Sequence, residues 1–505
     1  MLLKRSTKTK LAVVTSLALQ IITIICGIIV PRIMIGAYGS ELYGATTSIL
    51  QFLAYISLLE GGIGGVARAA LYKHIASCEE EKTSKIYHEI KRFFNIIAII
   101  FIAYTLVVAS TYKYMARVEF IDWTSTFLLV VAISISSLAQ YFIGFPNQVL
   151  VQADQRTYIV NVLNIITAIL NTVLTIVLIF LGCNIIIVKL VSSCVYTLRP
   201  LFLQLYVRCH YRITKTEREK ETILKDKWVG LGQHIAFFLH SNTDTVVLTL
   251  LADLKTVAVY SVYYMIISHI RNIVSVLTSG MEALFGDMLA RNEKENLSNT
   301  FDFYDTLISF VSVVIFSVTA VLIIPFVKLY TADITDANYI QPIFSILLIS
   351  GEFVYCLRSP FHNLIIAAGR FRQTQAAAYL EAAMNVILSC ALVFKFGLVG
   401  VAVGTLVSFL FRYIYYVFYL SKHIIYRKIS RFVKRTFVNS AAVLFVFFIG
   451  NRITGIMSIT NYGMWCVAGV IVTAVSFVIC AIINILFYRN DMFKIYAKVK
   501  KKREN

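Results

Sequence analysis

The sequence predicts an all-α polytopic membrane protein with about fourteen transmembrane helices. Hydrophobic residues make up 58% of the 505 residues and charged residues only 15%, and the mean hydropathy is +0.76. Soluble domains are roughly half apolar and a quarter charged, so this chain is solvated mainly by lipid. Apolar stretches of about 20 residues recur from Leu11 to Phe487. Each is long enough to cross a hydrocarbon core of roughly 30 Å as a helix.

The apolar stretches define the predicted transmembrane spans, and no polar interval between them is long enough to fold separately. The spans are residues 11–30, 43–67, 93–112, 125–151, 157–181, 185–207, 229–251, 257–284, 306–327, 341–366, 375–395, 399–420, 435–451 and 462–487. The first span follows Lys4 and Arg5, as a secretory signal would. Its length and the lack of a small-residue cleavage site predict a retained helix instead.

The net charge of +20 follows the predicted membrane topology. Lys395 and Arg435, at the ends of their spans, are counted with the adjoining loops. Of the 47 Lys and Arg residues, 35 then fall in the termini and the even-numbered loops, 7 in the other loops, and five inside spans. This is the positive-inside asymmetry, so both termini and the loops at 68–92, 208–228 and 421–434 are predicted to be cytoplasmic. Topology accounts for the basic charge, and nucleic-acid binding becomes an unnecessary interpretation.

The sequence contains no pattern that is typical of a nucleotide, metal or disulfide site. The GxxxxGK[ST] motif is absent, and the nine cysteines include no CxxC pair. A membrane glycosyltransferase or polymerase would need a positioned acid or base and room outside the bilayer to seat an acceptor. Every predicted non-cytoplasmic loop is shorter than about 20 residues. We therefore expect no enzymatic activity, no cofactor and no metal.

A repeat with an offset of 214 residues relates the two halves of the chain. The matched positions are Pro146 and Pro360, Leu150 and Leu364, Ala153 and Ala367, Arg156 and Arg370, and Asn171 and Asn385. With an offset of 213, Arg199 pairs with Arg412. Six predicted helices separate equivalent points, and an even number preserves orientation. The halves are therefore predicted to be parallel repeats about an axis along the membrane normal.

The repeat predicts a chain of three parts. Residues 1–221 hold helices 1–6 as an N-terminal lobe, and residues 222–424 hold helices 7–12 as a C-terminal lobe. Residues 425–505 add helices 13 and 14 and a basic cytoplasmic tail. Two lobes of this kind, arranged around a polar cavity, are a known transporter plan.

Four short stretches give the chain a resemblance to a known superfamily. They are Glu41-Leu42-Tyr43-Gly44, Leu59-Glu60-Gly61-Gly62-Ile63-Gly64-Gly65 before Arg68, Gln152-Ala153-Asp154-Gln155-Arg156 before Tyr158, and Asn242-Thr243-Asp244 before Val259-Tyr260-Ser261. In order and spacing they resemble the multidrug/oligosaccharidyl-lipid/polysaccharide exporter superfamily, and within it the bacterial polysaccharide flippases. The resemblance covers nearly the whole chain.

The resemblance implies a flippase of the bacterial cytoplasmic (inner) membrane. It would move polyprenyl-pyrophosphate-linked oligosaccharide by alternating access, for surface polysaccharide biosynthesis. Its expected partners are the lipid-linked oligosaccharide, membrane lipids, a polysaccharide polymerase and glycosyltransferases. Two alternatives of the same superfamily stay open: an ion-coupled multidrug or small-molecule exporter, and a lipid II-type flippase.

Four arginines fall near the centres of predicted spans, where a charge costs at least about 2.5 to 3.5 kcal/mol and should face protein or a water-filled cavity. They are Arg199, Arg271, Arg358 and Arg412. A guanidinium can hold phosphate oxygens with two parallel hydrogen bonds, so we expect these arginines, with Tyr264, to bind substrate. Glu352 and Glu381 also fall inside spans, and mutual ion pairs within each half are therefore the alternative.

The seventh predicted span is the most polar. Its residues Gln233, Phe237, His240 and Asp244 form one stripe along a helix. His240 and Asp244 lie one turn apart, a spacing that suits a proton relay. We expect Asp244, His240 and Glu60 to serve ion coupling or conformational switching, with a proton or sodium as the candidate ion. The alternative is a satisfied polar pair that locks two helices together.

Overall fold

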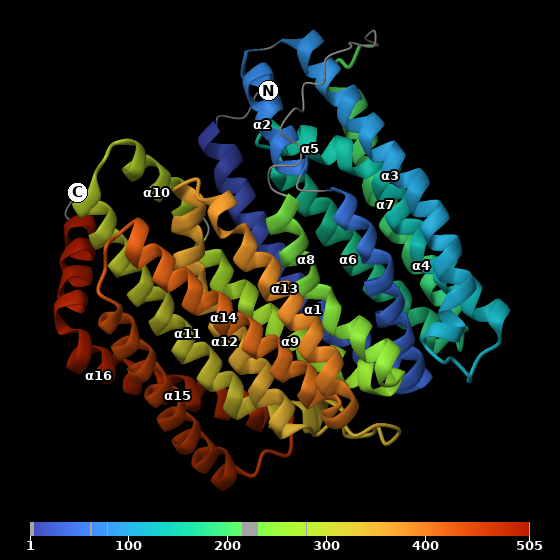
Figure 1. The fold of residues 1–505 in the computed structure, drawn as a ribbon. Helices are drawn as coiled ribbons and strands as arrows, with labels where there is room; N and C mark the ends of the chain where they lie inside the picture. The colour runs from blue at the N-terminus through green and yellow to red at the C-terminus, as the bar shows by residue number, and fades with distance from the viewer. Residues whose placement is uncertain (1–4, 61–62, 78, 215–230, 279, 504–505) are drawn as a thin grey trace. The chain divides into compact units, whose positions relative to one another are not determined.

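The computed structural model describes the chain except for residues 1–4, 61–62, 78, 215–230, 279 and 504–505. The described residues form helices and their connections, with no strand among them, and the predicted all-α polytopic fold is confirmed. Twelve helices in this part of the chain are long and apolar enough to cross a membrane. The chain divides into two compact units, Met1–Ser261 and Val262–Asn505, coloured from blue to green and from green to red in Figure 1.

Unit 1 is a bundle in which α1 packs along α6, α4 along α7, and α3 along α4. Its elements are α1 (Arg5–Ala54), η1 (Tyr55–Glu60), α2 (Ile63–Ala76), α3 (Glu80–Met115), α4 (Trp123–Ala139), η2 (Gln140–Gly144), α5 (Phe145–Ala153), α6 (Thr157–Phe180), α7 (Ile185–His210), α8 (Leu231–Leu251) and the start of α9 (Leu254–Thr278). Of the two η segments, η1 is a 3₁₀-helix and η2 is a single turn of π-helix between α4 and α5.

The first predicted span and the first part of the second, up to Ala54, are joined in the single long helix α1. A helix of 50 residues is about 75 Å long at 1.5 Å per residue, more than twice the roughly 30 Å of a bilayer core. The helix is broken at Gly39, whose φ of 81° and ψ of 165° lie outside the helical region and suit only glycine. Within the described residues, each of the fourteen predicted spans lies mainly on helices, and the span predicted at 229–251 corresponds to α8, which begins at Leu231.

Unit 2 is built around α14, on which both α12 and α13 pack, and around α11, on which α12, α15 and α16 pack. Its elements are the rest of α9, α10 (Met281–Ala290), α11 (Lys294–Tyr330), α12 (Pro342–Ala367), α13 (Phe371–Phe396), α14 (Leu398–His423), α15 (Ile429–Met457) and α16 (Tyr462–Arg503). The spans sit where hydropathy predicted them, and α3 and α11 begin more than ten residues before the predicted apolar stretches.

The last two helices, α15 and α16, are held against α11 by apolar contacts and by a buried polar one. The apolar contacts form a cluster of Val313, Val314, Ala442, Val446 and Cys480. The hydroxyl oxygens of Ser317 and Ser476 lie 3.0 Å apart in the same interface. The predicted lobe boundary between residues 221 and 222 lies outside the described residues, and the three-part division stays a prediction.

The turn that follows α5 recurs after α12 at the repeat offset of 214 residues. The backbone N–H groups of Arg156 and Arg370 each donate to the carbonyl five residues earlier, at 3.0 and 3.1 Å. The preceding residues, Gln155 and Gly369, have left-handed φ values of 58° and 66°. A left-handed residue with such a bond closes the carboxyl end of a helix. The sequence repeat is therefore matched by a repeat of local backbone structure.

Gly44 on α1 permits a contact between two backbones, and its replacement tests the packing of unit 1. A Cβ atom at this position would collide with the carbonyl group of Leu254 at the start of α9. Because a backbone carbonyl yields less than a side chain, Gly44→Ala should destabilise the fold by about 1–3 kcal/mol. We expect a lower melting temperature for the variant in detergent. Gly65→Ala is the control, since nothing lies within 4 Å of its Cβ position. Equal melting temperatures for the two variants would contradict this packing.

Candidate functional site

Three charged side chains meet inside unit 2, where α12, α13 and α14 pack together. Glu381 on α13 accepts hydrogen bonds from Arg358 on α12 and from Arg412 on α14. The three residues are only 2%, 7% and 4% exposed, respectively. The Nε and Nη2 atoms of Arg412 also donate to the hydroxyl of Tyr416, at 3.0 and 2.6 Å. One carboxylate therefore connects three helices in an apolar interior.

A second ion pair extends this group of charges. Arg271 on α9 donates to both carboxylate oxygens of Glu352 on α12, at 3.1 and 3.3 Å. The Arg271 guanidinium lies 5.8 Å from the ring centre of Tyr264 and 5.5 Å from that of Tyr355. Arg358 lies 4.7 Å from the same Tyr355 ring. Because aromatic faces attract cations, Tyr355 joins the two ion pairs into one cluster.

We call this set the arginine cluster. It consists of Arg271, Arg358, Arg412, Glu352 and Glu381. Three guanidinium groups against two carboxylates leave the cluster with one net positive charge. These three arginines form ion pairs within one half of the chain, which was the alternative to substrate binding. Their contact with substrate, and that of Tyr264, stays a prediction.

Arg199 in unit 1 has different partners. Its Nη1 atom donates to Asn164 Oδ1 on α6 and its Nη2 atom to Gln140 Oε1 in η2, both at 3.0 Å. Both acceptors are neutral amides, and the half-buried guanidinium keeps its charge without a carboxylate among the residues that the structure describes. A cation held in this way can still attract an anion, because its nearest neighbours orient it and do not neutralise it.

The repeat explains why the two equivalent arginines differ. At an offset of 214 from Glu381, the first half carries Thr167, whose hydroxyl donates to the carbonyl of Leu163 within its own helix. The carboxylate that neutralises Arg412 therefore has no counterpart near Arg199. Sequence reasoning noticed the pair of arginines and missed this difference, although a comparison of the residues around them would have revealed it.

The predicted coupling residues lie in unit 1. Asp244 on α8 is 3% exposed and accepts a hydrogen bond from the hydroxyl of Tyr260 on α9 at 3.0 Å. Glu60, at the end of η1, accepts one from the hydroxyl of Tyr141 at 2.5 Å. The backbone of His240 belongs to α8, and its side chain lies outside the described part of the chain. A role in coupling stays a prediction for all three residues.

Two further carboxylate sites were missed by sequence reasoning. Asp305 on α11 accepts from Arg427 at 2.9 Å, and Asp154 after α5 accepts from Lys8 at 2.9 Å and from the hydroxyl of Tyr211 at 2.7 Å. Burial, and then the bond to Asp154, raise the pKa of the Tyr211 phenol, so it remains a donor at neutral pH. The basic residues involved had been interpreted only as signals of topology.

The fold can be compared with those of known proteins. A scan against protein-family models and a search of curated proteins find no match. Among solved structures, the chain is similar to the lipid II flippase MurJ in its inward closed conformation, with a TM-score of 0.70 and 15% identity over 95% of this chain and 99% of that one.

Two multidrug transporter structures are also similar. The eukaryotic MATE transporter AtDTX14 gives a TM-score of 0.60 at 13% identity, over 86% of this chain and 99% of that one. The MATE multidrug transporter DinF-BH gives 0.59 at 16% identity, over 83% and 97%. At these identities the likeness is one of fold, and the fold is therefore shared by a flippase and by drug transporters.

Glu381 can be tested as the group that neutralises the arginine cluster. Glu381→Gln would leave Arg358 and Arg412 buried without their carboxylate, and losing one partner of a buried ion pair typically costs about 3–5 kcal/mol. We expect the variant to melt at a lower temperature in detergent and to yield less monodisperse protein. Glu295→Gln, at an exposed position of α11, is the control. A melting temperature that matches that control would show that the cluster does not depend on Glu381.

Proposed function

We propose that this protein is a flippase that moves polyprenyl-pyrophosphate-linked oligosaccharide across the cytoplasmic membrane for surface polysaccharide biosynthesis. The headgroup would cross through the protein by alternating access while the polyprenyl tail stays in the bilayer. The observation that carries the proposal is Arg199, a cation within a membrane-spanning helix that is held by neutral amides. Such a guanidinium suits the oxygens of a pyrophosphate.

The similarity in fold supports the same proposal. The chain shares its fold with a lipid II flippase over almost its whole length, and that protein by its name moves a lipid. The multidrug transporters with the same fold support the alternative of an ion-coupled drug or small-molecule exporter. Charge separates the two classes, because a site built on an arginine favours an anionic headgroup and disfavours a cationic drug.

Arg199 and the arginine cluster would have different tasks. Arg412 is bonded to Glu381 within unit 2, so its replacement would disturb folding as well as any binding. Arg199 is held by amides and not by a carboxylate, so its loss leaves no buried charge unpaired and should disturb folding less than the loss of Arg412. We therefore assign substrate contact first to Arg199. We propose that Arg271 and Arg358 contribute through the one net positive charge of the cluster, and Tyr264 through its aromatic ring beside Arg271.

Transport in purified components is the direct test. The protein would be reconstituted in proteoliposomes with fluorescent undecaprenyl pyrophosphate carrying an oligosaccharide, with fluorescent lipid II, or with a cationic dye. We expect the glycan-linked lipid to cross fastest, as measured by the fraction that a membrane-impermeant reductant quenches. Faster movement of lipid II would favour the lipid II-type flippase, and transport of the dye alone would overturn the proposal in favour of a drug exporter.

The same assay tests Arg199. Arg199→Ala should reduce the affinity for the glycan-linked lipid about 10- to 100-fold, because one charge-assisted contact contributes about 1.5–3 kcal/mol. Arg199→Lys should restore little of it, since an ammonium lacks the bidentate geometry. Arg372→Ala, at an exposed position of α13, is the matched control. Unchanged transport by correctly folded Arg199→Ala would refute a role in substrate binding.

Asp244 is the proposed coupling residue, because a buried carboxylate within the membrane marks a functional site by default. Asp244→Asn removes the charge at nearly constant shape and keeps an oxygen that can accept from Tyr260. We expect the variant to transport at one rate whether or not a proton or sodium gradient is imposed, whereas the wild type should respond to one of them. A gradient response that survives the substitution would leave Asp244 with a structural role only.

A further inference from the structure

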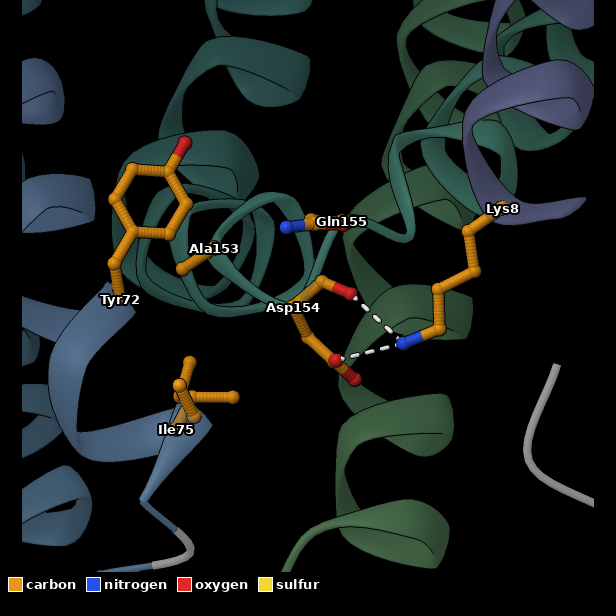
Figure 2. A pocket seen from close by; sticks show the side chains of 7 residues that line it. Lys8, Tyr72, Ile75, Ala153, Asp154 and Gln155 are labelled. Atoms are coloured by element: carbon orange, nitrogen blue, oxygen red, sulfur yellow. Dashed lines mark hydrogen bonds and ion pairs between the residues drawn. The ribbon is translucent and has the colours of Figure 1, made fainter. Parts of the chain in front are cut away.

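The end of unit 1 that is predicted to be cytoplasmic contains a pocket of about 680 Å³. This volume lies within the roughly 300–1,000 Å³ that is common for small-molecule sites. Figure 2 shows Tyr72 and Ile75 of α2 on one side, Lys8 of α1 on the other, and the turn with Asp154 and Gln155 between them. The pocket belongs to unit 1 alone and has no part in the arginine cluster.

The charges of the pocket disfavour an anionic ligand. Lys8 Nζ lies 2.9 Å from Asp154 Oδ1 and 3.1 Å from the Asp154 carbonyl oxygen, so its ammonium group is already paired (Figure 2). The other carboxylate oxygen of Asp154 accepts from the hydroxyl of Tyr211 at 2.7 Å and lies 2.7 Å from Arg156 Nε. A phosphate entering here would meet the carboxylate and would have to displace it from Lys8. A neutral polar ligand would not pay this electrostatic cost.

The remaining walls of the pocket have the chemistry that recognises a sugar. Tyr72 is 48% exposed and offers an aromatic face, and the amide of Gln155 can both donate and accept a hydrogen bond. Ile75 and the two alanines of the pocket are apolar. A pyranose ring has apolar C–H faces and a rim of hydroxyl groups, so it can stack on the tyrosine and bond to the amide.

The turn that contains Gln155 can be compared with its counterpart in the second half of the chain. Its φ of 58° is a left-handed conformation that costs a residue other than glycine about 1–2 kcal/mol. The equivalent turn of the second half has Gly369 at this position and Ala368 in place of Asp154. The two turns have the same backbone, yet only the first carries the side chains that line a pocket. The side chains that line the pocket are therefore particular to the first half and do not follow from the shape of the turn.

We infer that this pocket binds the neutral sugars of a lipid-linked oligosaccharide on the cytoplasmic side, before the headgroup is translocated. The inference rests on the proposed function and deepens it, because it separates recognition of the glycan from recognition of the pyrophosphate. Sugars would be selected at the Tyr72 and Gln155 pocket, and the pyrophosphate by Arg199. A substrate that lacks sugars would then still bind, with lower affinity.

Binding to the full-length protein in nanodiscs tests the inference. The probes are undecaprenyl pyrophosphate without sugar and the same lipid carrying a disaccharide of neutral hexose, N-acetylhexosamine or 6-deoxyhexose. We expect the wild type to bind at least one glycosylated probe about five- to tenfold more tightly than the bare lipid, the range for one aromatic contact with added hydrogen bonds. Tyr72→Ala should abolish this preference and leave the affinity for the bare lipid unchanged.

Three further variants test the tyrosine hydroxyl, the Gln155 amide and the loss of an exposed tyrosine elsewhere. Tyr72→Phe should keep most of the preference, because stacking needs only the ring. Gln155→Gly should weaken it while the turn is retained, since glycine adopts the observed φ without strain. Tyr114→Ala is the matched control, because Tyr114 is 72% exposed and does not line the pocket.

The outcomes distinguish this inference from the proposed function. If glycosylated probes are preferred equally by the wild type and by Tyr72→Ala, the sugars bind elsewhere and only the pocket inference fails. The same conclusion follows if the wild type binds and transports the bare lipid as well as every glycosylated one. If the wild type neither binds nor transports any of these lipids, the proposed function fails and the pocket inference fails with it.

Discussion

The burial of charge in an apolar interior determines how unit 2 is assembled, and the Glu381 carboxylate is the group on which this depends. It accepts from Arg358 and Arg412, which lie on the two helices adjacent to its own. Each of the three helices must therefore present one particular face to the others. A small rotation of any helix would expose a charge to hydrocarbon, at a cost of several kcal/mol. The ion pairs therefore fix both the rotation of each helix about its axis and its position along that axis. Apolar contacts alone restrict these two much less.

The two halves of the chain show how one scaffold can hold charge in two ways. Their local backbone repeats at the turns that contain Gln155 and Gly369. Where unit 2 has Glu381, the first half has Thr167, and the arginine equivalent to Arg412 is held by amides. The carboxylates of unit 2 thus pair with its intramembrane arginines. In unit 1, Arg199 is held by neutral amides instead.

Much of the fold could be predicted from the sequence, because hydropathy reports directly on which segments lie in lipid. The identity of the charged residues in the spans was also visible. Their partners were not, since the position of a residue along a span gives its depth but not the direction in which it points. Arg271 and Glu352 are 81 residues apart in the sequence, and only the folded chain brings their side chains together.

The sites missed by sequence reasoning have the same kind of explanation. The partners of Arg199 are neutral amides, which give no signal in a search for opposite charges. Lys8 was counted only as a topological charge and Asp154 only as part of a family-like stretch, and the two are 146 residues apart. The π-helical turn η2, which carries Gln140, has no composition that distinguishes it from an ordinary helix. Each of these features becomes visible only when helices are seen side by side.

The break at Gly39 divides α1 into two helical segments that meet at a kink. The helical segment before Gly39 is held at its start by the bond from Lys8 to Asp154. Next to Gly39 it is held by the hydroxyl of Tyr38, which donates to the Cys183 carbonyl at 2.6 Å. The segment after Gly39 is anchored to α8, where the hydroxyls of Ser48 and Thr249 lie 2.7 Å apart. No loop separates the two helical segments. A change in the angle between them at this break therefore changes the φ and ψ angles of Gly39. Along α1, Gly39 is therefore the residue at which the helical segment bonded to Asp154 and Cys183 meets the segment bonded to α8.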